Sequence, residues 1–446
     1  MNDTRTGLRQ AIGLTRATAM VIGTIIGASI FVQPSLVSGA VPSVTGMLLV
    51  WAVAGVLTLI GALVTAELAS AFPGTGGVYV FLRESYSPAV AFLWCWAMFW
   101  SMHTGIVAAI ATVCARYVAF FVPLGDVGVK VVAIAAILIL SAVNYVGVRH
   151  GTTVQTAFTI IKVAAVVLIA IAGVVASGSV PPAAAQTTAT VVPSLRAFVT
   201  ATVAGLFAFG GWHMVTYTGD ETVDARRTIP RALLIGTLAV TASYIAVNGA
   251  YLAVLSPAAV ASSNRVAADF ADRVLGSGGA AAMSALVVLS TLGAMTGIIL
   301  TGPRVYLAAA HDGLLFRWIG EIHPRFGTPH HAIALQAVWA SVLVATGTYR
   351  ALFTRVVYTE WIFFGLMAAG VFILRRRAGY SPAYRAWGYP LLPLIFIVAT
   401  AIIVFNQLAA DPIESATGLL IVLAGLPIYY LRAARLNSRT VTHADS

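Results

Sequence analysis

Two glycine-rich stretches, each inside a long apolar run, decide the fold of this chain: residues 23–31 read GTIIGASIF, and residues 205–212 read GLFAFGGW. Inside a lipid bilayer, backbone that leaves a helix survives only where protein or a water-filled cavity satisfies its amide groups. We therefore expect both stretches to interrupt membrane helices beside a cavity. The competing interpretation is that the glycines, such as Gly23 and Gly27, only let neighbouring helices pack closely.

The composition around these stretches is that of a membrane protein. Of 446 residues, 59% are hydrophobic and only 9% are charged, whereas soluble domains carry roughly 25% charged residues. A soluble enzyme, a disordered chain and a secreted module are therefore excluded. The net charge of +11 is spread singly or in small groups between apolar runs, so we expect the lipid bilayer as a partner and no nucleic acid.

Hydropathy predicts twelve spans, because one crossing takes about 20 apolar residues. The two glycine stretches fall in spans one and six, the first place in each half of a five-plus-five arrangement, which is typical of transporters built from repeats. We expect a single membrane domain over 1–446, with an N-terminal segment 1–13, a first repeat 14–177, a second repeat 197–374, peripheral helices 389–431 and a tail 432–446. The predicted spans lie near 14–40, 46–71, 89–122, 128–148, 153–177, 197–218, 230–255, 280–310, 331–349, 352–374, 389–408 and 414–431.

Charge asymmetry predicts the orientation. With an even number of spans, most of the 26 Lys and Arg residues fall on the side that holds both termini. Basic loops stay in the cytoplasm, so we expect both termini there, in the plasma membrane, or in the inner membrane of a bacterium. The uncharged segment 177–193 is expected to be an external loop.

Several strings resemble one known family. Residues 23–32 (GTIIGASIFV), 66–82 (AELASAFPGTGGVYVFL) and 207–233 (FAFGGWHMVTYTGDETVDARRTIPRAL) resemble the amino acid, polyamine and organocation superfamily, specifically its L-type amino acid transporter branch. The likeness continues through 300–329 and 360–377. It implies an all-α membrane protein with a twelve-helix LeuT-type 5+5 inverted repeat, which transports neutral L-amino acids by alternating access, through exchange or proton coupling.

A broken helix offers groups that match an amino acid zwitterion. The N–H groups that start its second half can hold a carboxylate, and the carbonyls freed from its first half can accept from an ammonium group. Backbone at residues 27–29 is expected to hold the carboxylate, and carbonyls near Thr24, Ile25, Phe207 and Phe209 are expected to hold the amino group. The predicted substrate-binding residues are Thr24, Ile25, Gly27, Ala28, Ser29, Phe207, Phe209, Gly210, Gly211 and His213.

Three of these positions leave alternatives open. The resemblance implies that Phe207 is an aromatic gate, although an ordinary core phenylalanine is the alternative. The family commonly shows Gly-Ser-Gly where this chain has Gly27, Ala28 and Ser29, so Ser29 is expected to narrow the pocket in favour of small substrates. His213 either meets a substrate side chain, brings pH dependence, or only positions the loop as a neutral histidine.

Lys162 lies deep in the fifth span and is one of two lysines in the chain. A buried ammonium group is expensive unless it is paired or loses its proton. In the relatives that this chain resembles, a lysine here stands where sodium-coupled transporters of the same fold hold an ion between spans one and eight. We therefore expect a sodium-independent tether from Lys162 to carbonyls near Ile22 or Gly23 and to hydroxyls of Ser290 or Thr291; the alternative is a lysine that snorkels to an interface.

Acidic residues are expected near the ends of spans. Glu67 and Glu360 are expected to pair with arginine or backbone rather than to bind substrate. A charge network that latches a cytoplasmic gate is expected among Asp220, Glu221, Asp224, Arg226, Arg227 and Arg231; the alternative is a solvated cluster of ion pairs that contributes little. None of the three acids in this network is placed deep enough to neutralise a cationic substrate, which argues against arginine, lysine and polyamines.

Other classes of function find little support. The chain has no nucleophile elbow, no Walker sequence and no His-Glu-x-x-His pair, so we expect no enzyme, no cofactor and no metal, and His330 and His331 lack clustered Cys or acidic partners in the sequence. A cationic amino acid or polyamine antiporter is the alternative within transport. A channel or a membrane sensor is the alternative outside it. Cys95 and Cys114 share one apolar run and the loop 123–128 has no Cys, so no disulfide-linked heavy subunit is expected beside the amino acid substrate.

Overall fold

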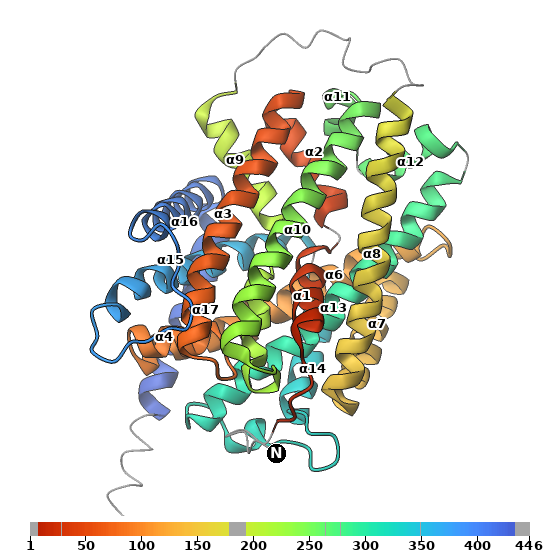
Figure 1. The fold of residues 1–446 in the computed structure, drawn as a ribbon. Coiled ribbons are helices and arrows are strands. Elements are labelled where there is room, and N and C mark those ends of the chain that lie inside the picture. Colours follow the sequence, from red (N-terminus) through yellow and green to blue (C-terminus); the bar gives the residue numbers. More distant parts are fainter. Residues whose placement is uncertain are drawn as a thin grey trace, which may run out of the picture.

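The computed structural model describes residues 8–27, 29–177, 193–263, 265–276, 278–347 and 349–432. Within these ranges every regular element is a helix (Figure 1), apart from one isolated bridge between Ile12 and Thr222. The predicted all-α class is therefore confirmed.

The first half of the chain begins with a bent pair of helices. α1 and α2 meet at an angle of 45° across a short break, and the third span is interrupted by the π-helical turn η1. The elements are α1 (Leu14–Ile25), α2 (Ser29–Ala40), α3 (Val44–Ala71), α4 (Val78–Ser85), α5 (Pro88–Ala97), η1 (Met98–Met102), α6 (His103–Val118), α7 (Asp126–Val146) and α8 (Val148–Ser177).

The second half also begins with an interrupted helix, in which the α-helix α9 gives way to the 3-10 helix η3. The elements are α9 (Leu195–Ala208), η3 (Trp212–Glu221), α10 (Ala225–Val254), α11 (Pro257–Ser262), α12 (Val266–Leu275), α13 (Gly279–His311), η4 (Arg317–Gly320), α14 (His330–Thr346), α15 (Tyr349–Leu374), α16 (Leu391–Ala410) and α17 (Pro412–Leu423).

Nine helices of the described part are long and apolar enough to cross a membrane, and the bent pair α1 and α2 makes a tenth. Two shorter apolar helices, His330–Thr346 and Tyr358–Leu374, lie where the ninth and tenth spans are predicted. Each predicted span thus coincides with a helix. The count of twelve crossings remains a prediction.

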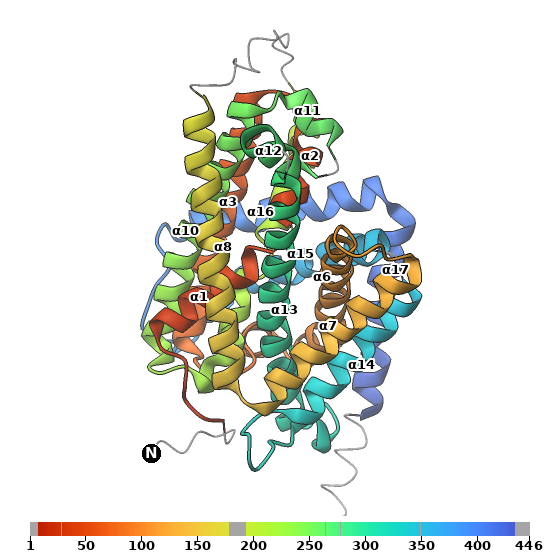
Figure 2. The same cartoon turned by 90° about the vertical axis from the view of Figure 1, so that its right-hand side faces the viewer.

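Small residues let the long helices approach one another. α10 passes close to three other helices: it meets α3 where Gly55 faces Thr241, it meets α8 where Gly173 faces Ala250, and it meets α1 where Gly236 faces Val21. α13 lies at the centre of the molecule (Figure 2), in contact with α1 and α8 on one side and with α6, α7 and α14 on the other. The two interrupted helices are held inside this framework.

The segment before α1 is joined to the end of η3. The backbone N–H groups of Ala11 and Ile12 donate to the Glu221 carbonyl at 2.9 and 3.0 Å, and Val223 N–H donates to the Ile12 carbonyl at 2.9 Å. The segment before α1 and the segment at the end of η3, which flank the two interrupted helices, are therefore joined by main-chain hydrogen bonds.

Candidate substrate site

The first break lies between Ile25 and Ser29. Ile26 N–H still donates to the Ile22 carbonyl at 2.9 Å, and Ile26 itself has extended backbone, with φ −72° and ψ 90°. The predicted break in span one is present. Ala28, which we expect to hold the substrate carboxylate, lies outside the described residues.

The second break runs from Phe209 to Gly211. Gly210 N–H donates to the Phe207 carbonyl at 3.1 Å, and Gly211 adopts φ +100°, a left-handed conformation that suits glycine. A Cβ at Gly211 would also lie 3.0 Å from the Thr24 carbonyl oxygen. Glycine is thus required here both for the turn and for the close approach of the other break.

The two breaks contact each other directly. The Thr24 hydroxyl lies 3.1 Å from the Gly211 carbonyl oxygen. The hydroxyl of Tyr244, on α10, lies 3.1 Å from the Ile25 carbonyl oxygen and 2.9 Å from that of Ala208, within hydrogen-bonding distance of both. One buried side chain therefore joins the last turn of α1 to the last residue of α9.

Tyr244 is a functional candidate that the sequence interpretation missed. The signal was available, because a tyrosine buried in an apolar span needs a partner for its hydroxyl. Its position also changes the expected amino-group site, since the Ile25 carbonyl already faces a protein donor. The Phe207 carbonyl likewise accepts from Gly210, although a carbonyl oxygen keeps a second lone pair.

Exposure separates the predicted substrate residues into two groups. Gly210 is exposed, and Ser29 and Phe207 are half-buried. Phe209 is buried beside Trp51 and Tyr244, with ring centroids 6.4 and 4.9 Å away. The accessible group therefore consists of Ser29, Phe207 and Gly210, with the remaining described members, Thr24, Ile25, Gly27, Phe209, Gly211 and His213, behind it.

Lys162 is fully enclosed at the first break. Its Nζ lies 3.0 Å from the Gly23 carbonyl oxygen, 2.6 Å from that of Ile26 and 3.2 Å from that of Ser290. An ammonium group has three N–H donors, so these three acceptors satisfy it completely. The side chain is 1% exposed and does not reach an interface.

The partners of Lys162 differ in detail from the expected ones. The ammonium group contacts the Ser290 carbonyl, whereas the Ser290 hydroxyl lies 3.2 Å from the Gly27 carbonyl oxygen. Thr291 uses its hydroxyl within α13, on the Val287 and Val288 carbonyls, because a threonine in a helix readily bonds the preceding turn. The Ile22 carbonyl remains in the ladder of α1. α8, α1 and α13 nevertheless meet at one cation.

The expected charge network at the end of η3 has a different composition. Glu221 pairs with Arg304 of α13, at 2.7 and 2.8 Å through both carboxylate oxygens, and both side chains are at most 1% exposed. Asp224 and Arg227 are 4.0 Å apart and exposed. The prediction that Glu221 faces the arginines just after it was wrong, because its side chain points into the core, where only a charged partner compensates for lost solvation.

The two acids of spans two and ten also differ. Glu67 is buried and accepts from Arg375 at 2.8 and 2.6 Å and from Ala386 N–H at 2.7 Å, which confirms the expected pairing with arginine and backbone. Burial raises the pKa of Tyr380, with Glu67 adding to the shift, so its hydroxyl keeps the proton that it donates to Glu67. For Glu360 the expected pairing was wrong: it lies inside α15, 6% exposed, and its Oε1 has no hydrogen-bond partner.

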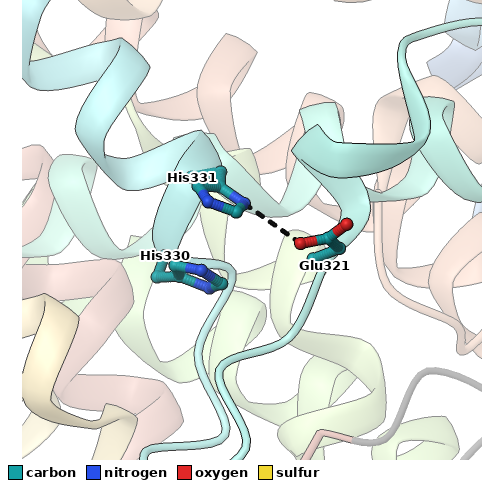
Figure 3. Close-up of side chains that lie close together, drawn as sticks. All are labelled: Glu321, His330 and His331. Atoms are coloured by element: carbon teal, nitrogen blue, oxygen red, sulfur yellow. Dashed lines mark ion pairs between the residues drawn. The ribbon is translucent and has the colours of Figure 1, made fainter.

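A further cluster lies where the segment after η4 meets the first turn of α14 (Figure 3). His331 Nδ1 lies 3.6 Å from a Glu321 carboxylate oxygen, and the rings of His330 and His331 are 3.9 Å apart. Donor atoms of the three residues lie within 4.8 Å of one another, close enough to share a metal ion. The expectation that His330 and His331 lack an acidic partner was therefore wrong, although His331 Nδ1 also lies 2.8 Å from the Trp318 carbonyl oxygen.

Two interrupted membrane helices in mutual contact, with accessible backbone at the breaks, define a carrier of small solutes. Comparison with known proteins agrees. A family model described as amino acid permease matches residues 12–429. The chain belongs to this amino acid permease family.

Curated relatives align along almost the whole chain. The large neutral amino acids transporter small subunit 2 of Rattus norvegicus is 33% identical over 437 residues, which is 95% of this chain and 81% of the relative. The serine/threonine exchanger SteT of Bacillus subtilis (strain 168) is 33% identical over 438 residues, 96% of this chain and 98% of the relative. The b(0,+)-type amino acid transporter 1 of Mus musculus is 32% identical over 435 residues, 96% and 88% respectively. These relatives are transporters and not enzymes, and the predicted class of protein is confirmed.

Proposed function

We propose that the protein is a sodium-independent secondary transporter of neutral L-amino acids that works by alternating access, through exchange or proton coupling. The observation that carries this proposal is the contact between the two helix breaks, through Thr24, Gly211 and Tyr244. This contact supports a substrate site between the start of α2 and the end of α9. The printed names of the relatives support amino acids as the substrate class.

The binding chemistry follows from the breaks. The N–H groups at the start of α2, from Ser29 onward, hold the substrate carboxylate, because the helix dipole favours an anion there. Carbonyls at the ends of α1 and α9, around Thr24 and Phe207, accept from the substrate ammonium group. Ser29, half-buried at the entrance, occupies space that a glycine would leave free, which favours small side chains.

Exchange of cationic amino acids is a second candidate, favoured by Glu360. Its carboxyl group is buried inside α15, and a buried carboxylate needs a cationic partner. The name of the b(0,+)-type relative describes amino acid transport without restricting it to large neutral substrates.

Uptake into proteoliposomes tests the proposed function. Purified protein is reconstituted, and each of the common amino acids is offered with and without internal substrate, in sodium buffer and in choline buffer. Saturable uptake of small neutral amino acids that internal substrate accelerates, and that choline leaves unchanged, supports the proposal. Uptake confined to basic amino acids, or dependent on sodium, contradicts it.

We propose one membrane domain oriented with both termini in the cytoplasm of a cell whose plasma membrane, or bacterial inner membrane, holds it. The domain comprises the repeats 14–177 and 197–374 and the peripheral helices 389–431. Cys95 and Cys114 are buried and free, so we propose that no heavy subunit is attached by a disulfide.

Two exposed serines test this orientation. Ser262 lies in α11, and Ser381 lies in the basic loop after α15. A Ser262→Cys variant is expected to react with an impermeant maleimide on intact cells, whereas Ser381→Cys is expected to react only after permeabilisation, because basic loops remain inside. The unmodified protein, with its two buried cysteines, is the control. Labelling of Ser381→Cys on intact cells would contradict the orientation.

Phe207 tests the gate. Phe207→Ala is expected to lower the apparent affinity for substrate by about tenfold, since removing an aromatic contact costs about 0.5–1.5 kcal/mol beyond its buried area. The half-buried position predicts little loss of folding stability. Uptake kinetics and thermal unfolding measure the two effects, and Phe209→Ala, within the buried cluster of Trp51 and Tyr244, is expected to destabilise the fold instead. A Phe207→Ala protein with wild-type kinetics would leave Phe207 as a packing residue.

A further inference from the structure

Five buried polar side chains gather beside the second break, from four different elements. They are at most 6% exposed. Two of them stand on η3, the half-helix that follows the break, and the others come from α6, α14 and α15. The cluster consists of His103, His213, Tyr217, Gln336 and Glu360.

Tyr217 is at the centre of this cluster. Its ring centroid lies 5.6 Å from that of His103 and 5.5 Å from that of His213. The helix α15, which carries Glu360, packs against η3 through Phe364, one turn after Glu360, whose ring centroid lies 4.7 Å from that of His213. His103 and Gln336 converge on Gly302 of α13, where a Cβ would lie 2.5 Å from His103 Nδ1. Glycine at position 302 thus makes room for two polar side chains in the membrane interior.

The hydrogen-bonding capacity of this cluster is unused. Both ring nitrogens of His103 and of His213, the Tyr217 hydroxyl, both amide atoms of Gln336 and Glu360 Oε1 have no hydrogen-bond partner. Buried polar groups in native proteins are nearly always paired, so such a concentration calls for a functional explanation. In the low dielectric of a membrane interior, each unpaired group is costly.

Glu360 differs from the other buried acids in having no cation. Glu67 pairs with Arg375 and Glu221 pairs with Arg304, whereas the described part of the chain provides no ion pair for Glu360. Other buried titratable groups on neighbouring helices include Tyr306 of α13 and Cys95 of α5, and neither is a cation. A carboxyl group in such surroundings is stable only in its neutral form.

We propose that Glu360, together with Tyr217, His213 and His103, forms a proton-binding site that couples proton movement to amino acid transport. This inference rests on the proposed function and selects its proton-coupled form. Glu360 holds the proton while η3 is packed against α15. Because Tyr217 and His213 stand on η3, a movement of this half-helix during alternating access changes the surroundings of the carboxyl group, which then exchanges its proton with water.

The test uses the full-length protein in proteoliposomes that contain a pH-sensitive dye. In the wild type, substrate uptake is expected to acidify the lumen, and an inward proton gradient is expected to drive accumulation. Glu360→Gln keeps the size of the side chain but cannot release a proton. The variant is expected to retain exchange at fixed pH. Its gradient-driven accumulation is expected to fall by at least about tenfold, which is the change that one pH unit makes in the protonated fraction of a single group. Glu321→Gln, at an exposed acid outside the cluster, is the matched control and is expected to behave as the wild type.

Infrared spectroscopy gives a second measurement that is independent of transport. The wild type is expected to show the C=O band of a protonated carboxyl group that shifts on addition of substrate, and Glu360→Gln is expected to lack it. If Glu360→Gln does not reconstitute, Tyr217→Phe removes only the hydroxyl and is expected to shift the pH midpoint of gradient-driven uptake. An unchanged midpoint in Tyr217→Phe, or intact gradient-driven accumulation in Glu360→Gln, would overturn the proposal.

The possible failures are distinguishable. Wild-type exchange of neutral amino acids without any proton movement overturns the proton site and leaves the proposed function intact. Transport of basic amino acids alone, lost in Glu360→Gln at every pH, assigns the carboxyl group to substrate binding and overturns both. Gradient-driven uptake that Glu360→Gln abolishes and Glu321→Gln preserves supports both.

Discussion

Lys162→Ala is expected to give a folded, membrane-inserted protein that transports substrate on the order of 100-fold more slowly than the wild type, or with changed asymmetry between the two faces. Three carbonyl contacts, from Gly23, Ile26 and Ser290, end at this ammonium group. Hydrogen bonds to charged groups contribute about 1.5–3 kcal/mol each, and a loss of about 3 kcal/mol in the coupling between α1 and α13 corresponds to roughly 100-fold. Initial rates of uptake and of efflux measure the effect.

Lys130, the other lysine, provides the control. It is exposed and donates to the Ala345 carbonyl at 2.7 Å, so Lys130→Ala is expected to transport normally. We propose that this ammonium group takes the place of a sodium ion, so wild-type uptake is expected to be the same in sodium and in choline. Wild-type rates in Lys162→Ala, or strict sodium dependence of the unmodified protein, would show that this lysine has no coupling role.

Arg304→Met is expected to lower stability sharply, because it leaves Glu221 charged and buried with no partner. Breaking a buried ion pair from one side costs about 3–5 kcal/mol, whereas replacing both partners is often neutral. Glu221→Gln is expected to be harmful for the same reason, and the double variant Glu221→Gln with Arg304→Met is expected to recover most of the lost stability. Thermal unfolding of the detergent-solubilised variants measures these differences.

An exposed pair serves as the comparison. Asp224 and Arg227 are 4.0 Å apart at the surface, where ion pairs contribute about 0–1 kcal/mol. Asp224→Asn is therefore expected to unfold at the same temperature as the wild type. Equal unfolding temperatures of Arg304→Met and Asp224→Asn would mean that the Glu221 carboxylate finds another partner. The pair with Arg304 would then not be what stabilises the contact between η3 and α13.

Much of the architecture could be predicted from the sequence because membrane burial leaves strong marks on it. Apolar runs predict the helices, and glycine clusters predict the break between Ile25 and Ser29 and the break at residues 209–211. Burial indicates that the Lys162 ammonium group needs partners, and the family resemblance assigned those partners to the helices α1 and α13. Which oxygen of Ser290 it contacts depends on local geometry: the carbonyl faces the ammonium group, whereas the hydroxyl faces the Gly27 carbonyl.

The incorrect expectations share a physical cause. The direction in which a side chain points and its depth in the protein decide its partners, and proximity in the sequence does not. Arg226 and Arg227 follow Glu221 closely, yet the side chain turns inward to Arg304, 83 residues away. Glu360 looked like the end of a span, but α15 begins at Tyr349 and carries it into the interior. The sequence indicates that the buried Tyr244 hydroxyl needs a partner, but not that the partners are the carbonyls of Ile25 and Ala208 at the two breaks.

The junction between residues 11–12 and residues 221–223 has a consequence for mutational studies of this protein. It consists of main-chain groups alone, so it keeps its strength whatever side chains stand there. Ile12 is fully buried, so its alanine variant reports lost packing, and an alanine scan is blind to the main-chain contact itself. Proline, which lacks the N–H group, is the one substitution among the twenty that would reveal it.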